Sequence, residues 1–330
     1  MTVANSATPI AALFLGPEGT YSHQAALQQF GDHPQAKFIV ADSIPECLER
    51  LENDSNIDFA AVPFENSTNG QVVFTYDLLR DRMAKQSDGG DGLNRVIPEL
   101  EVIDEQYVSV SHCLVASSPL NLESLPRYKR IRIYSHPQVW GQVDKYLQKL
   151  KNRCPQTVVE RIDTPSTSEA VRRTVQVESQ SGERSELNLA IASNAAAKVH
   201  NAHIIDQGIN DKQGNTTRFL IFRKRSATTV QLPDSRTKVS LLTFTIKQDN
   251  PRSLVDVLAV LKNHPVNMCS ISSRPLKEEP KGRKWQYIFF IEYYCDSNKI
   301  DWDAFYQEIS ASCSLWCLWG TFPRNELYSS

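Results

Sequence analysis

Short apolar runs alternate with polar, helix-periodic segments over the first two thirds of the chain. Apolar runs at residues 10–15, 57–62, 130–134 and 187–191 predict strands, and each leads into a polar turn followed by a helical pattern. After the third of these strands, for example, the pattern predicts one helix over residues 138–151. Repetition of strand, turn and helix predicts an α/β fold with largely parallel sheets.

The pattern changes after residue 237. Strands are predicted at residues 239–246, 266–273, 285–294 and 315–322, with helices at 251–263 and 301–312, which Asn250 and Asp301 would cap. This β-α-β-β-α-β order is that of the ferredoxin-like split unit. The sequence therefore predicts two domains, at residues 10–225 and 238–325, joined by a polar linker at 226–237.

Bulk composition narrows the possible functions. The 330 residues carry a net charge of only -2, which argues against a nucleic-acid or membrane-surface protein. The longest apolar runs fall far short of the 18 or so residues that a membrane span needs. Residues 1–9 lack the basic start and apolar middle of a secretory signal, so we expect a cytoplasmic protein.

Cysteine and histidine usage gives no indication of a metal site. The seven cysteines are odd in number and scattered, without any Cys-x-x-Cys pair, which argues against zinc and a disulfide framework. The histidines show no spacing typical of metal ligands. We expect mostly buried thiols in a reducing compartment and no metal cofactor.

Two hydroxyl-rich turns follow predicted strands. In the turn at residues 16–22, glycines let backbone amides approach an anion at a helix start, although a tight turn capped by Ser22 explains the same residues. In the turn at residues 63–70, Asn66 and Ser67 either cap a helix or present donors to a ligand carboxylate. Both interpretations stay open on spacing alone.

A third polar cluster, Thr217-Arg218, opens onto an apolar run and gives the sharpest hypothesis. Arginine binds a carboxylate through two charge-assisted hydrogen bonds, and the adjacent hydroxyl can donate to a leaving oxygen. The alternative is a surface arginine at the start of a strand. Histidine is a common proton donor in enzymes, and His136, in a Ser-His-Pro turn, is either a proton donor or a structural residue.

Taken together, these motifs resemble those of the prephenate dehydratase family, in the same order and over nearly the whole chain. The resemblance implies a catalytic domain with two lobes like a type II periplasmic binding protein, and an active site between the lobes. The motifs are Gly16-Pro17-Glu18-Gly19-Thr20-Tyr21-Ser22, Val62-Pro63-Phe64-Glu65-Asn66-Ser67, Ser135-His136-Pro137-Gln138, Ser166-Thr167-Ser168 and Asn215-Thr216-Thr217-Arg218-Phe219.

The resemblance also implies a reaction. Prephenate loses carbon dioxide and water to give phenylpyruvate, and formation of the aromatic ring drives the step without a cofactor. Thr217 would act at the leaving hydroxyl, with Glu65 or His136 as the proton source. Arg218 would hold the side-chain carboxylate. The remaining substrate-binding residues would be Thr20, Ser22, Asn66, Ser67, Thr167 and Phe219.

The tail is similar to an ACT domain, the regulatory module that binds phenylalanine in this family. Arg252-Ser253-Leu254 stands where the family has Gly-Ala-Leu, and Ser272-Ser273-Arg274-Pro275 where it has Glu-Ser-Arg-Pro. The resemblance implies feedback inhibition by L-phenylalanine. The long aromatic strand at residues 285–294 favours pairing between subunits, so we expect a homodimer or homotetramer. The implied effector residues are Leu254, Asn267, Ser273, Arg274 and Pro275.

Two other functions stay open at this point. Arogenate dehydratase performs the same elimination on the amino analogue of prephenate, and composition does not separate the two substrates. A non-catalytic amino-acid sensor would also combine a ligand cleft with a regulatory tail, but the Thr217-Arg218 pair favours an enzyme.

Overall fold

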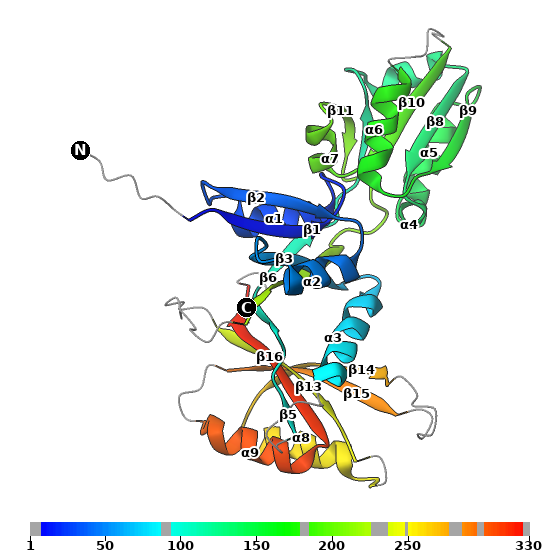
Figure 1. Ribbon diagram of the computed structural model, residues 1–330. Helices are drawn as coiled ribbons and strands as arrows, with labels where there is room; N and C mark the ends of the chain where they lie inside the picture. Colours follow the sequence, from blue (N-terminus) through cyan, green and yellow to red (C-terminus); the bar gives the residue numbers. More distant parts are fainter. Residues whose placement is uncertain are drawn as a thin grey trace. The chain divides into compact units, whose positions relative to one another are not determined.

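A computed structural model describes residues 8–86, 94–178, 185–225, 237–247, 250–276, 286–295 and 300–325 (Figure 1). The described chain falls into two compact units, each assembled from separate segments. The first unit takes Met1–Cys47, Glu65–Gly70 and Tyr107–Phe219, and the second takes Leu48–Phe64, Gln71–Gln106 and Leu220–Ser330. The predicted linker lies outside the described residues except for Thr237.

The first unit begins with β1 (Ile10–Leu15) and β2 (Ala36–Ala41), which pair in parallel from Ile10 opposite Ala36 to Leu15 opposite Ala41. The helix α1 (Tyr21–Phe30) connects them. Its N-cap is Thr20, whose hydroxyl accepts a hydrogen bond from the backbone N–H of His23 at 3.3 Å. The prediction that Ser22 caps this helix was therefore wrong, because the cap lies two residues earlier, at Thr20, and Ser22 lies inside the first turn.

A five-stranded mixed sheet forms the other part of the first unit, in the order β11-β7-β10-β8-β9. Apolar residues alternate along β10, so that Leu189 and Ile191 pack with α5 on one face, and Ala190 and Ala192 pack with α6 and α7 on the other. The elements are β7 (Cys113–Ala116), β8 (Arg130–Ser135), β9 (Val158–Asp163), β10 (Glu186–Ala192), β11 (His203–Gln207), α5 (Asp144–Arg153), α6 (Thr167–Glu178) and α7 (Asn194–Val199). The predicted α/β architecture is confirmed, but the expectation of largely parallel pairing was wrong for this sheet, because β7 pairs antiparallel with both β10 and β11.

The tail, which belongs to the second unit, has the predicted β-α-β-β-α-β order. Its elements are β13 (Lys238–Thr245), α8 (Ser253–Asn263), β14 (Met268–Pro275), β15 (Tyr287–Tyr294), α9 (Trp302–Ser312) and β16 (Leu315–Pro323). Both helices pack on one face of the sheet, where Val257 and Phe305 lie in one apolar cluster with Leu242 and Ile291 (Figure 1). The strand order is β14-β15-β13-β16-β5, and the added strand β5 (Arg95–Val96) was not predicted.

Two helix caps in the tail test the sequence analysis. Asp301 caps α9 as predicted, since its carboxylate accepts from Ala304 N at 3.1 Å. The prediction that Asn250 caps α8 was wrong. The helix begins at Ser253 after Arg252, because Asn250 instead accepts from Arg252 N at 3.0 Å and closes a turn before it.

The remaining elements are α2 (Ile44–Asn53), β3 (Phe59–Asn66), β4 (Gly70–Gln71), α3 (Val73–Gln86), β6 (Leu100–Ser109), the 3₁₀ helix η2 (Leu122–Arg127), α4 (Pro137–Trp140) and β12 (Thr216–Lys224). Across the described ranges, no helix combines the length and the apolar character that crossing a membrane demands.

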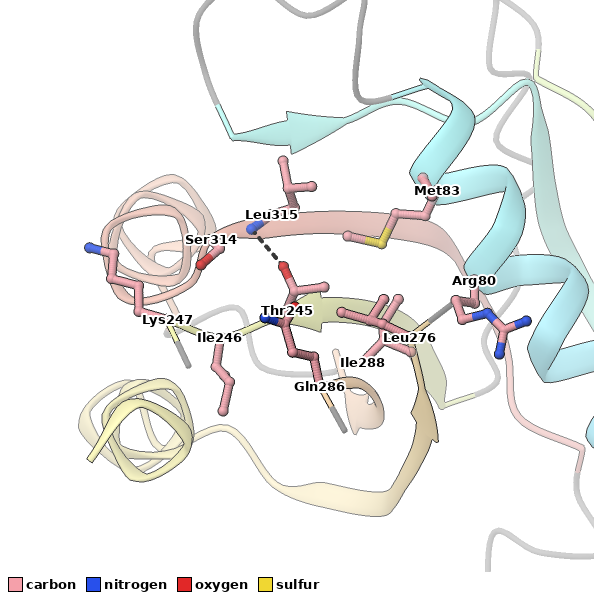
Figure 2. A pocket seen from close by; sticks show the side chains of 11 residues that line it. Arg80, Met83, Thr245, Ile246, Lys247, Leu276, Gln286, Ile288, Ser314 and Leu315 are labelled. Carbon is pink, nitrogen blue, oxygen red and sulfur yellow. Dashed lines mark hydrogen bonds between the residues drawn. The ribbon is translucent and has the colours of Figure 1, made fainter. Parts of the chain in front are cut away.

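Within the second unit, α3 is joined to the end of β14 by charged side chains. Asp77 receives two hydrogen bonds from Arg274, at 2.9 and 3.3 Å, and Arg80 donates to the carbonyl of Pro275 at 2.8 Å. A cavity of about 380 Å³ adjoins this junction. Its lining includes Arg80 and Met83 from α3 together with Thr245, Leu276, Ile288 and Leu315 at the strand ends (Figure 2).

Gly320 of β16 gives a test of the packing in the second unit. A Cβ added there would lie 2.1 Å from the carbonyl oxygen of Val102, which is backbone and cannot turn aside. We expect Gly320→Ala to lower the free energy of unfolding by about 1–3 kcal/mol. Gly141→Ala, at a helix end with nothing within 4 Å of the added carbon, is the control. Equal urea midpoints for the two variants would contradict this packing.

Candidate active site

Two segments far apart in the sequence meet where β3 ends and β12 begins. The side-chain amide of Asn66 donates to the Thr217 hydroxyl oxygen at 3.0 Å and to Asn215 Oδ1 at 2.8 Å. Backbone bonds support this approach, because Ser67 N donates to Thr216 O at 2.8 Å and Thr216 N donates to Ser67 Oγ at 2.9 Å. The structure thus brings the second and third polar clusters together.

The orientation of the Asn66 amide is fixed by the backbone of its own turn. Asn66 Oδ1 accepts from the N–H groups of Thr68 and Asn69, both at 3.0 Å. A carbonyl oxygen held by two donors leaves the amide nitrogen to face the half-buried Thr217. Thr217 therefore accepts from Asn66 and still carries its own hydroxyl hydrogen.

Asn215 and Gln142 extend this polar group, and the sequence analysis gave neither of them a role. Asn215 is 7% exposed and donates to Gln142 Oε1 at 3.4 Å. Gln142 lies in the break between α4 and α5, whereas the sequence predicted one continuous helix over residues 138–151. Gly141, the C-cap of α4, is the residue that could have indicated this break from the sequence, because glycine is common where helices end.

Arg218 and Glu65 form an ion pair beside Thr217. Arg218 Nη1 lies 2.8 Å from Glu65 Oε1, and their side chains are 2% and 36% exposed. The arginine also lies over the ring of Tyr107, with its guanidinium carbon 5.9 Å from the ring centroid. The carboxylate is therefore the accessible member of the pair. Phe219 is buried in the core, so its contact with substrate, like that of Arg218, remains a prediction.

The turn at residues 16–22 is held by hydroxyl groups from two helix starts. Ser193 Oγ donates to the carbonyl of Gly19 at 2.9 Å, and Ser168 Oγ donates to the carbonyl of Glu18. Thr20 donates its own hydrogen to Leu15 O at 3.0 Å. The Thr20 hydroxyl thus serves the turn itself in this structure.

The other predicted residues lie at helix starts. Ser22 is buried in the first turn of α1, and Thr167 is the half-buried first residue of α6. His136 caps α4, because its Nδ1 accepts from Gln138 N at 3.3 Å. Within the described ranges, no direct hydrogen bond links Ser22, Thr167 or Thr20 to Thr217, so their roles toward substrate stay predictions. The same ranges contain no group of three His, Cys, Asp or Glu side chains that could hold a metal ion.

Comparison with known proteins gives consistent matches. A family model described as prephenate dehydratase matches residues 12–227. A probable prephenate dehydratase of Saccharomyces cerevisiae is 51% identical over 324 residues, which cover 96% of this chain and 97% of the yeast protein.

Two solved structures share the fold at lower identity. One is a prephenate dehydratase from Arthrobacter aurescens in complex with L-Phe, with a TM-score of 0.71 and 22% identity, covering 97% of this chain and 92% of that one. The other is GqqA, described as a novel type of quorum quenching acylase. It has a TM-score of 0.73 and 21% identity, and the match covers 97% of this chain and 99% of GqqA. At these identities, both structures show the fold alone.

His23 makes the stability of the first unit depend on pH. Its ring stacks on Phe14 with centroids 4.6 Å apart, and its Nδ1 accepts from Gly19 N at 3.0 Å. Burial lowers the pKa of His23, against a smaller opposing effect of Glu18. Below about pH 6.5 the unfolded chain therefore takes up a proton that the folded chain does not, and stability falls as pH falls.

We expect His23→Gln to reduce this pH dependence. Between pH 7.5 and 5.5 the variant should lose less unfolding free energy than the parent protein, by up to about 1 kcal/mol. Urea unfolding at the two pH values measures the difference. His203→Gln, at an exposed strand start, is the control and should keep the parental pH dependence. A parental pH dependence in His23→Gln as well would show that His23 is not responsible.

Proposed function

The chain belongs to the prephenate dehydratase family, and we propose that it performs the family's reaction with the Thr217 hydroxyl directed at the departing oxygen. It is an enzyme, a prephenate dehydratase of phenylalanine biosynthesis. Prephenate loses its ring carboxylate as carbon dioxide and its ring hydroxyl as water, and phenylpyruvate results. The protein has to position the dianion and stabilise the charge that develops on the leaving oxygen.

The hydrogen bond from Asn66 to Thr217 is the observation that supports this role most directly. A hydroxyl that accepts a hydrogen bond becomes a better donor, because the two bonds polarise each other. A donor already in place stabilises charge on the leaving oxygen without reorganisation during the reaction. A threonine hydroxyl is too weak an acid to give up its proton fully, so Thr217 acts by hydrogen bonding and another group supplies the proton.

The contacts of Glu65 and His136 favour His136 as that proton source. Glu65 is paired with Arg218 at 2.8 Å, and an ion-paired carboxylate is an acceptor rather than a donor. His136 Nδ1 accepts the cap bond from Gln138 N. The ring can supply a proton only from its imidazolium form, because the N–H of a neutral imidazole is as weak an acid as a threonine hydroxyl, and a proton on Nδ1 would replace the cap bond. In this arrangement Arg218 holds Glu65 in place. Direct binding of the side-chain carboxylate by Arg218 would require its guanidinium to become exposed.

Removal of the Thr217 hydroxyl tests the proposed chemistry. We expect Thr217→Ala to lower kcat by about 100-fold, the scale of a lost transition-state donor. We expect KM to change by less than about threefold, because the hydroxyl acts mainly in the transition state. Formation of phenylpyruvate from prephenate, followed by absorbance, gives both constants.

Two further variants serve as controls. Thr217→Ser keeps the hydroxyl and should retain most of the turnover. Thr216→Ala, one residue earlier, removes a hydroxyl that only approaches the carbonyl of Gly214 at 3.5 Å and should turn over like the parent protein. Normal kcat in Thr217→Ala would remove Thr217 from the mechanism.

We also propose that the tail binds L-phenylalanine and that subunits associate through it. The fold shared with the L-Phe complex from Arthrobacter aurescens supports the effector. The strand β14 supports association, because it is the edge strand of the sheet and exposes Met268 and Ile271. Apolar residues on an exposed sheet edge are typical of a surface that pairs with a second copy, as in a homodimer or homotetramer.

Asn267 gives a test of the effector site. Its side chain is exposed immediately before β14, so its removal leaves the core intact. We expect phenylalanine to inhibit the parent protein, and Asn267→Ala to raise the half-inhibitory concentration by about tenfold, the scale of one or two lost hydrogen bonds. Asn263→Ala, exposed at the end of α8, is the control. Turnover that is indifferent to phenylalanine, together with a monomer in sedimentation, would contradict this proposal.

We propose a cytoplasmic location. All seven cysteines are free thiols, and five of them are buried. Burial raises the pKa of Cys113 and Cys154, which keeps these thiols protonated and unreactive. Free thiols of this kind suit a reducing compartment.

A further inference from the structure

His112 lies between β6 and β7, and it takes no part in the reaction steps described above. It is 1% exposed, and its backbone is fixed on both sides, since its N–H donates to Asn210 Oδ1 at 2.7 Å and its carbonyl accepts from Ile209 N at 3.1 Å. Both ring nitrogens are in hydrogen bonds. Nδ1 is 3.2 Å from the hydroxyl of Tyr21, and Nε2 is 3.0 Å from Gln142 Oε1.

A backbone carbonyl determines which atom of Gln142 faces the ring. Gln142 Nε2 donates to the carbonyl of Gln138 at 3.3 Å, and a carbonyl can only accept. The amide oxygen of Gln142 therefore faces His112. Because that oxygen also only accepts, His112 Nε2 must carry the hydrogen. A neutral ring has one N–H, so Nδ1 is left to accept from Tyr21.

The hydrogen bonds that begin at Asn66 lead independently to the same orientation of the Gln142 amide. The backbone N–H groups of Thr68 and Asn69 hold Asn66 Oδ1, so Asn66 Nδ2 must donate outward. It donates to Asn215 Oδ1 at 2.8 Å, which leaves the Asn215 amide nitrogen to donate to Gln142 Oε1 at 3.4 Å. The two assignments meet at that oxygen without conflict.

On the basis of the proposed function, we propose that His112 is a positioning residue for the dehydratase reaction. Its Nε2–H holds the amide oxygen of Gln142. That oxygen accepts from Asn215, and Asn215 in turn accepts from Asn66, so His112 keeps Asn215 in place against the amide that donates to Thr217. The opposite tautomer would place a lone pair against Gln142 Oε1. The Gln142 amide would then have to turn over, which would break its bond to Gln138 and face its nitrogen toward the amide nitrogen of Asn215.

The electrostatics of the site agree with this assignment. Burial lowers the pKa of His112, against a smaller opposing effect of its hydrogen bond to Gln142, so the ring is neutral at neutral pH. Burial also raises the pKa of Tyr21, which therefore keeps its hydroxyl hydrogen, with His112 Nδ1 and the carbonyl of Ser111 both 3.2 Å from the hydroxyl oxygen. These effects agree with a neutral ring, and the bonds of Gln142 place its single hydrogen on Nε2.

Nitrogen NMR of the intact protein labelled with ¹⁵N-histidine tests the tautomer directly. The His112 signals are identified by their absence from His112→Gln. At pH 7.5 we expect the hydrogen on Nε2 and a bare Nδ1. A hydrogen on Nδ1 overturns the inference. This result does not depend on turnover, so it is separate from the question of whether the chain is a prephenate dehydratase.

Two amide substitutions then separate positioning from simple packing. Glutamine places its amide nitrogen near the position of Nε2, whereas asparagine places its amide near Nδ1. We expect His112→Gln to retain kcat within about threefold and His112→Asn to lose about tenfold or more, the scale of one lost buried hydrogen bond, with little change in KM. Circular dichroism checks that both variants fold. If asparagine supports turnover as well as glutamine does, the role is structural and the inference fails; if neither variant folds, the NMR result decides.

Discussion

One hydrogen bond, from the side-chain amide of Asn66 to the hydroxyl of Thr217, is the interaction on which the site depends. It joins two turns that lie 151 residues apart in the sequence. Its direction is not free, because the backbone N–H groups after Asn66 already hold the amide oxygen. Backbone geometry thus sets the orientation of the Asn66 side chain, and the Asn66 amide in turn orients the Thr217 hydroxyl. Such pre-organisation is what an elimination reaction requires from a protein.

Much of the fold was predictable because it follows from periodicity. The strand, turn and helix order of the first unit and the β-α-β-β-α-β order of the tail both come from local alternation of apolar residues, and the structure confirms them. Boundaries were predicted less well. Asn250 and Ser22 are good capping residues by type, but Asn250 closes the turn before α8 and Ser22 lies inside the first turn of α1. Capping propensity does not distinguish positions two residues apart.

The candidate site was predictable in part, because some of its residues form local sequence motifs. The turns with Asn66 and Thr217 were found because hydroxyl and amide residues gather where strands begin and end, and the structure brings them together. Gln142 and His112 were missed, because their partners come from other segments of chain and no local pattern records those contacts. Burial of Arg218 was missed as well, since type alone favours an exposed arginine and only the fold supplies the pairing with Glu65.

The measurement that tests the account most directly is a double-mutant cycle on kcat with Asn66→Ala, Thr217→Val and the combined variant. If the amide acts by preparing the hydroxyl, each single change removes the same contribution, and the double variant should be about as slow as the slower single one. The coupling should then be at least about tenfold in kcat. Independent effects, in which the two losses multiply in the double variant, would contradict the account.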